Sequence, residues 1–174
     1  MALEEHTDIS LEEVEAEPEK PATPYFIDQR WYEDNGLSFP DVIMARMCEA
    51  CQARAAAGEV AEERYTEYDP KTRRAFQRTR QVPFASNPIK RIREDCSAKK
   101  GYISPDMPSL EAVFRIYLAN GNQPMPLTHV REQLVDWCPD GQCRWLLLSD
   151  AQLERMVASD GHYGLRPVAR PDEQ

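Results

Sequence analysis

Prolines limit this chain to short structural elements. Fourteen of them occur in 174 residues, against only seven glycines. Proline has no backbone N–H and a fixed φ, so it starts or interrupts helices and is excluded from the middle of a sheet. Together with a hydrophobic fraction of 41% and a mean hydropathy of −0.66, this composition predicts a modest core and much irregular chain.

Negative charge is concentrated at the N-terminus. Residues 1–35 hold 11 acidic and 2 basic side chains, a net charge of −9 that equals the formal net charge of the whole protein. Residues 1–24 are also rich in proline and poor in large apolar side chains, so burial cannot offset the entropy lost on ordering. We expect residues 1–24 to be a disordered acidic tail, which either solvates the protein or folds on a basic partner. A second short tail is expected at 169–174.

Large aromatic side chains begin abruptly after this tail. Trp31 and Tyr32 belong to a dense aromatic stretch that either packs within its own module or anchors another protein. A helix is predicted over 38–57, with Ser38 as its cap and Gly58 as its end, and a more polar helix over 59–68. Residues 25–70 are therefore expected to be a small helical, cysteine-containing module.

One basic stretch lies inside this acidic chain. Residues 71–103 hold 10 basic and 2 acidic side chains, a net charge of +8. Two short helices joined at 83–86 are predicted here, the second capped by Asn87. The cations bind nucleic acid, bind an acidic protein, or are neutralised by the chain's own carboxylates, and these alternatives stay open. The candidate partner-binding residues are Arg73, Arg74, Arg78, Arg80, Lys90, Arg91 and Arg93, with Trp31 and Tyr32 as apolar anchors.

Residues 104–168 show the most regular helical pattern. Helices are predicted over 110–119 and from 127, and Ser149 with Gln152 forms a capping-box pattern that starts a third. An extended segment at 162–168 follows. Three short helices and a strand in this order resemble a winged-helix or helix-turn-helix domain. The third helix is acidic, so the resemblance implies a winged helix that suits protein contact better than DNA.

Four of the five cysteines form two closely spaced pairs. Cys48 and Cys51 have the CxxC spacing that lets two thiolates bind one zinc ion, and Cys138 and Cys143 flank a turn-forming Pro-Asp-Gly. Together they would clamp the N-terminal module to the C-terminal third. Cys96 and His129 are alternative ligands, and buried filler is the rival interpretation of all the cysteines. A thioredoxin-type redox role is disfavoured because no strand is predicted before Cys48.

Motifs for catalysis are missing from the sequence. It contains no glycine-rich phosphate loop, no GxSxG, no HExxH and only three histidines. No apolar run approaches the ~20 residues that span a bilayer, and the N-terminal residues lack the pattern of a secretory signal. We therefore expect a mainly α-helical, cytoplasmic, non-enzymatic adaptor or regulatory protein, in which a structural zinc site is one of the two interpretations of the cysteines. The alternatives are a nucleic-acid-associated protein of the transcription or translation machinery, and a thiol- or metal-dependent enzyme.

Overall fold

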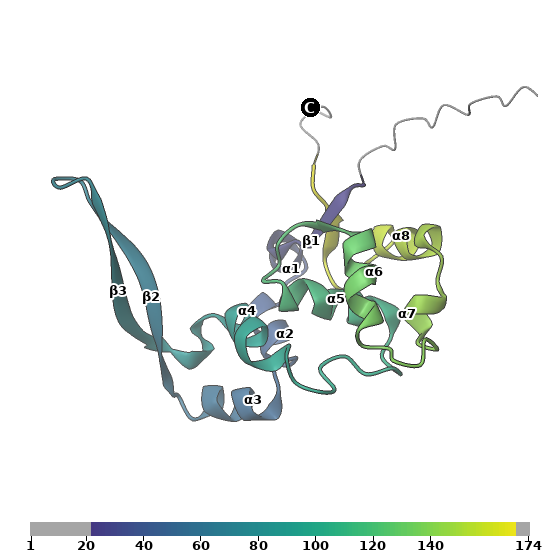
Figure 1. Ribbon diagram of the computed structural model, residues 1–174, viewed down its shortest axis with the longest axis horizontal. Coiled ribbons are helices and arrows are strands. Elements are labelled where there is room, and N and C mark those ends of the chain that lie inside the picture. Colours follow the sequence, from purple (N-terminus) through teal and green to yellow (C-terminus); the bar gives the residue numbers. More distant parts are fainter. Residues whose placement is uncertain (1–21, 170–174) are drawn as a thin grey trace, which may run out of the picture.

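The computed structural model describes residues 22–169 and combines short helices with two small antiparallel sheets (Figure 1). The expectation of a mainly α-helical chain is therefore wrong, and the fold is a mixture of helices and strands. Most of the two expected tails, at 1–21 and 170–174, lies outside the described residues.

A three-stranded sheet joins the two ends of the described chain. Strand β1 (Pro24–Ile27) lies between β4 (Met125–Pro126) and β5 (Leu165–Pro167), antiparallel to both. Tyr25 and Ile27 alternate with their neighbours and point into the core, which is the period-two burial of a strand. The module expected at 25–70 and the domain expected at 104–168 therefore share one sheet.

The helix predicted over 38–57 is two helices. After α1 (Gln29–Asp34), α2 covers Phe39–Met44 and α3 covers Glu49–Ala56. Ser38 caps α2 as predicted, and Gly58, with a φ of 68°, follows the end of α3. Cys48 is extended, with φ −66° and ψ 155°, and is the N-cap of α3. The turn before it buries Met47 and brings the Cys48 backbone N–H to the Sγ of Cys96, contacts that a straight helix could not make.

A long hairpin replaces the helices predicted over 59–68 and up to residue 81. Strands β2 (Val60–Asp69) and β3 (Arg74–Pro83) pair along their whole length and project from the helical body as an arm (Figure 1). Glu63 lies opposite Arg80, and Glu67 pairs with Arg78 across the strands. Aromatic and β-branched residues such as Tyr65, Thr66 and Tyr68 suit a strand, and cross-strand pairing outweighs the helix preference of single Glu and Arg residues.

The chain returns from the arm through a short 3-10 turn, η1 (Phe84–Ser86), and α4 (Pro88–Arg91). Asn87 caps α4 as predicted, since its side chain accepts a hydrogen bond of 3.0 Å from the Lys90 N–H. A π-helical turn, η2 (Ile92–Cys96), follows directly.

Helix α5 (Ser109–Ala119) is the centre of the body and contacts β1, η2, α6 and α7. The remaining helices are α6 (Leu127–Val135), α7 (Arg144–Leu147) and α8 (Asp150–Ala158). Both hydrogen bonds of the predicted capping box at Ser149 and Gln152 are present. The helix positions predicted in this region are confirmed, with α7 added in the long connection after α6.

Candidate metal centre

Three cysteine thiols meet on the body where α3 begins and η2 ends. The Sγ atoms of Cys48, Cys51 and Cys96 all lie within 4.8 Å of one another, and those of Cys48 and Cys96 are 3.4 Å apart. Cys51 and Cys96 are buried and Cys48 is half-buried. Zn–S bonds of about 2.3 Å at tetrahedral angles place two sulfurs about 3.8 Å apart, so small side-chain movements suffice for one ion to reach all three.

Two separate segments supply these thiols. Cys48 caps α3 and Cys51 lies in its first turn, so both sulfurs are near the positive end of that helix. Cys96 ends the π-helical turn η2. Such wide turns are found frequently at functional sites, and this one brings the Cys96 sulfur within 3.2 Å of the Cys48 backbone nitrogen.

Lys99 completes the cluster. Its Nζ lies 3.0 Å from the Sγ of Cys48. The spacing from Cys96 to Lys99 repeats the spacing from Cys48 to Cys51, so a lysine stands where a second CxxC would have its last cysteine. Sequence reasoning counted Lys99 only as one positive charge among ten. The CxxK spacing was the signal that could have identified it.

The thiols differ in acidity. Burial alone would raise the pKa of Cys48, but hydrogen bonds from the Lys99 ammonium, the Cys51 backbone N–H and the other two thiols outweigh it and lower the pKa to about 7. Burial raises the pKa of Cys96 to about 12 and also raises the pKa of Cys51. Cys48 is therefore the first of the three thiols to ionise in the metal-free cluster, and binding of a metal ion by all three must also displace the protons of Cys51 and Cys96.

A cavity of about 560 Å³ opens beside the cluster. Its lining includes Cys48, Cys96 and Lys99 together with Lys100 and Tyr102. Within residues 22–169, no histidine or carboxylate joins the three sulfurs as a fourth ligand. A tetrahedral ion bound here would therefore keep one position for water.

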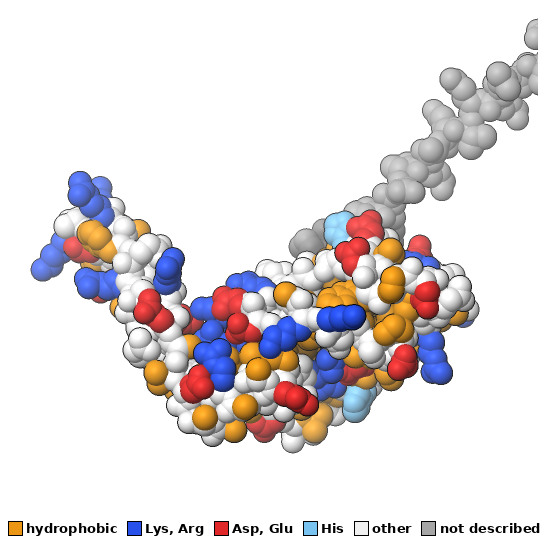
Figure 2. Space-filling view, turned by 60° about the horizontal axis from the view of Figure 1, so that its bottom comes forward, with side chains coloured by type: hydrophobic (Ala, Val, Ile, Leu, Met, Phe, Trp, Pro, Cys, Tyr) orange, Lys and Arg blue, Asp and Glu red, His pale blue; other side chains and the backbone are white. Residues whose placement is uncertain are grey.

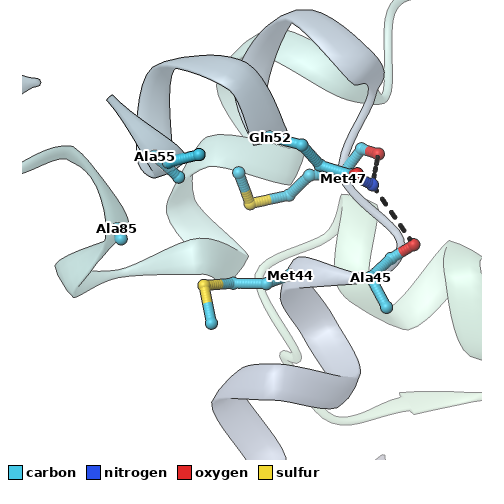
Figure 3. A pocket seen from close by; sticks show the side chains of 7 residues that line it. Met44, Ala45, Met47, Gln52, Ala55 and Ala85 are labelled. Atoms are coloured by element: carbon cyan, nitrogen blue, oxygen red, sulfur yellow. Dashed lines mark hydrogen bonds between the residues drawn. The ribbon is translucent and has the colours of Figure 1, made fainter. Parts of the chain in front are cut away.

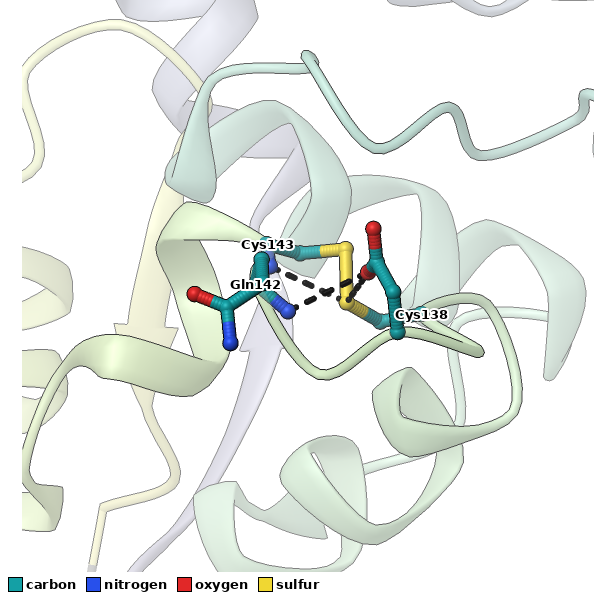
Figure 4. Close-up of a disulfide and its surroundings, with 4 residues drawn as sticks. Cys138, Gln142 and Cys143 are labelled. Atoms are coloured by element: carbon teal, nitrogen blue, oxygen red, sulfur yellow. Dashed lines mark hydrogen bonds between the residues drawn. A yellow bond between two sulfur atoms is a disulfide. The ribbon is translucent and has the colours of Figure 1, made fainter.

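The four-cysteine zinc site predicted from the sequence does not form. Cys138 and Cys143 are joined by a disulfide in the connection between α6 and α7 (Figure 4). Their sulfurs are bonded to each other, and the backbone N–H of Cys143 points at the Sγ of Cys138, 3.0 Å away. Cys96, predicted as an alternate ligand, takes their place. His129 is exposed on α6 and does not belong to the cluster.

The predicted basic residues divide into two groups. Those beyond the arm's loop are paired: Arg78 with Glu67, Arg80 with Glu63 at 2.7 Å, and Lys90 with Glu63 at 3.7 Å. Arg91 and Arg93 both approach Glu94, and Arg91 is only 5% exposed. In contrast, Arg73 and Arg74, with Lys71 beside them, form no ion pair with any residue in 22–169. The chain's own carboxylates therefore neutralise part of the basic stretch, whereas the cations in the loop of the arm have no ion-pair partner within residues 22–169.

The two predicted aromatic anchors are mainly structural. Tyr32 is 1% exposed and donates a hydrogen bond of 2.7 Å to the carbonyl of Tyr163, so it packs inside the body. Trp31 is half-buried against the core, with the Arg166 guanidinium 5.7 Å from its ring.

An apolar pocket of about 350 Å³ lies between α2, α3 and η1 (Figure 3). Met44 and Met47 line it with Ala55 and Ala85, and Gln52 donates a hydrogen bond of 2.8 Å to the carbonyl of Met47. No titratable side chain lines this pocket, so it offers no acid, base or nucleophile.

Comparison with known proteins found no family model, no curated protein and no solved structure that matches this chain. The resemblance to a winged helix therefore remains a prediction. None of the helices within residues 22–169 combines the length and the apolar composition needed to cross a bilayer.

Proposed function

We propose that this chain is a zinc-stabilised interaction protein, in which one ion bound by Cys48, Cys51 and Cys96 fixes the root of a projecting arm. The convergence of three thiols from two separate segments carries the proposal. Thiolates are soft ligands that favour zinc over hard cations such as Mg²⁺ and Ca²⁺.

The surroundings of the sulfurs suit a bound ion. Three thiolates and one Zn²⁺ leave a single negative charge, and the Lys99 ammonium, 3.0 Å from the Cys48 sulfur, balances it. The Cys48 N–H also donates to the Cys96 sulfur. Such outer contacts hold metal ligands in place and reduce the charge on the sulfurs.

The position of the ion explains what it would stabilise. Helix α3 runs through Gly58 into β2, and β3 returns through η1 and α4 to η2. An ion shared by α3 and η2 therefore joins the chain entering the arm to the chain leaving it. The aromatic ring of Phe84 lies at the same root, 4.0 Å from the Arg54 guanidinium and 4.8 Å from that of Arg91. Zinc and this stacked ring together would set the direction of the arm.

Native mass spectrometry of zinc-supplemented protein tests the metal site. We expect one zinc per chain, lost on addition of a chelator and lost in Cys96→Ser. The matched control is the double variant Cys138→Ser/Cys143→Ser, which removes the disulfide and should keep the metal. A wild-type mass equal to the bare chain, under conditions that preserve known zinc proteins, overturns the proposal.

A thiol activity is the second candidate, favoured by the lowered pKa of Cys48 and its neighbours. A thiolate at a helix N-terminus, beside a lysine and a second cysteine, is the arrangement of reactive and redox-active thiols. Native mass spectrometry also separates the two candidates, because only the zinc proposal requires bound metal. Wild-type protein that takes up no zinc when zinc is supplied, and whose Cys48 alkylates rapidly at neutral pH, would favour the thiol activity.

A further inference from the structure

We propose that the free end of the arm binds nucleic acid, with Lys71, Arg73 and Arg74 on phosphates and the rings of Tyr68 and Phe76 against sugars or bases. This inference rests on the proposed function, because it names the partner of the arm that the metal would hold. Figure 2 shows positive side chains gathered at this end of the arm, away from the body.

The cations of the loop form no ion pair with the acidic side chains of residues 22–169, although Asp69 lies directly opposite Arg74. Asp69 is the backbone partner of Arg74 at the end of the β2–β3 ladder. Its carboxylate accepts hydrogen bonds from the Lys71 N–H, at 2.8 Å, and from the Thr72 hydroxyl, at 2.9 Å. Arg73 takes the left-handed conformation, with a φ of 54°, that closes the turn. The Asp69 carboxylate is thereby engaged in hydrogen bonds within the loop. The side chains of Lys71, Arg73 and Arg74 are exposed, and none of them forms an ion pair with residues 22–169.

Two aromatic rings next to these cations are exposed to solvent. Tyr68 is 61% exposed and Phe76 is 44% exposed. Tyr68 lies opposite Ala75 and Phe76 opposite Glu67, so the alternation of side chains puts the two rings on opposite faces of the ribbon. Exposed rings beside unpaired cations are the combination that binds single strands, where bases stack on aromatic side chains and Lys or Arg contacts the backbone.

The shape of the arm favours nucleic acid over an acidic protein. Ten residues in each strand give a ribbon about 30 Å long, and the DNA major groove admits a two-stranded ribbon. An arm of this length also carries its positive end away from the helical body (Figure 1). Residues 22–169, arm included, hold 20 acidic and 19 basic side chains and are therefore nearly neutral. Most of the chain's excess negative charge lies in residues 1–21.

Fluorescence anisotropy on zinc-loaded, full-length protein tests the inference. The probes are a labelled single-stranded DNA, a duplex and an RNA, each about 20 nucleotides long, titrated between about 50 and 200 mM salt. We expect binding that weakens steeply with salt. The variant Lys71→Gln/Arg73→Gln/Arg74→Gln should bind at least about tenfold more weakly, with a salt slope smaller by about two to three because three phosphate contacts are lost.

Matched variants separate the loop from general charge. Arg30→Gln/Arg144→Gln/Arg155→Gln removes the same charge from exposed positions on the body and should bind like the wild type. Tyr68→Ala/Phe76→Ala should weaken single-strand binding about tenfold while leaving the salt slope unchanged. The relative affinity for the three probes identifies which nucleic acid the arm prefers.

Three outcomes overturn the inference: no binding by the wild type at about 50 mM salt, equal losses in both triple variants, or equally tight binding of polyglutamate, which would indicate an acidic protein partner. Zinc content measured on the same samples separates this inference from the metal site. If the protein binds nucleic acid but contains no zinc, the zinc proposal fails and the inference about the arm holds. If it contains zinc but binds no nucleic acid, the inference about the arm fails and the zinc proposal holds.

Discussion

The body and the arm of this protein are stabilised by different interactions. In the body, α5 buries seven of its eleven residues, and β1 joins segments from both ends of the described chain. In the arm, most side chains of β2 and β3 are exposed, and its ion pairs lie in water. Exposed ion pairs contribute about 0–1 kcal/mol each to stability, and an isolated two-stranded hairpin is marginally stable at best. The arm therefore contributes little to the stability of the body, which is the expected balance for an element that serves contact.

Replacing a phenylalanine by alanine in the body and in the arm should give the largest difference in the free energy of unfolding. Phe114→Ala empties a site in α5 that is 0% exposed and touched by the Arg46 guanidinium, 4.8 Å from the ring. We expect it to lower the free energy of unfolding by about 3–5 kcal/mol, measured by urea denaturation. Phe76→Ala in the arm should change it by less than about 0.5 kcal/mol. Comparable losses in the two variants would show that the arm is packed in solution and would contradict the comparison.

Metal removal tests how the two regions are joined. An ion present at 100 to 1,000 times its dissociation constant stabilises the folded protein by about 2.7–4 kcal/mol, so a chelator should lower the unfolding midpoint. Hydrogen exchange should speed up first at the root of the arm, around Gly58 and Phe84, because the ion would join the two chains there. Cys96→Ser should show the same exchange pattern without chelator and should not respond when chelator is added. Faster exchange confined to α6 or α8 would place the metal elsewhere.

One glycine in the body and one at the root of the arm have the same backbone conformation, so the cost of Gly→Ala at each compares how tightly the two regions are packed. Gly164 and Gly58 both have a φ of 68°. A Cβ at Gly164 would lie 2.9 Å from Cε2 of the buried Tyr32 ring, whereas nothing lies within 4 Å of one at Gly58. Gly164→Ala should cost about 1–2 kcal/mol for the left-handed backbone and a further 1–3 kcal/mol for overpacking. Gly58→Ala should show the backbone cost alone. Thermal unfolding of both variants gives the difference.

Sequence reasoning succeeded where a local signal decides the structure. Ser38, Asn87 and the Ser149 capping box were each read from residue type and spacing, and each forms the predicted bond. Long-range pairing decides the rest, and the arm shows why it was missed. Arg, Glu and Gln favour helix when each is considered alone, and only the pairing of Glu63 with Arg80 makes the two strands evident.

The candidate site was half predictable for the same reason. Cys48 and Cys51 are close in sequence, so their spacing identified them. Cys96 reaches them only because the chain folds back after the arm, and the disulfide between Cys138 and Cys143 removed the other expected pair. The break between α2 and α3, which puts Cys48 at a helix start, occurs where the Cys48 backbone contacts Cys96, a residue distant in sequence.

The smallest expected effect concerns the acidity of Cys48 in metal-free protein. Its pKa is lowered from 9.0 to about 7, so the folded state holds the thiolate more readily than the unfolded chain. This contribution to stability is present above pH 9 and is lost as the pH falls through 7. We expect the rate of Cys48 alkylation by iodoacetamide, followed by peptide mass spectrometry, to rise with a midpoint near pH 7. Lys99→Met removes the ammonium that stabilises the thiolate and should move this midpoint upward, whereas Lys100→Met, which has no such contact, should leave it in place. A midpoint that does not move in Lys99→Met would mean that the helix N-terminus and the neighbouring thiols alone lower the pKa, and that the lysine does not act as the charge partner of the cluster.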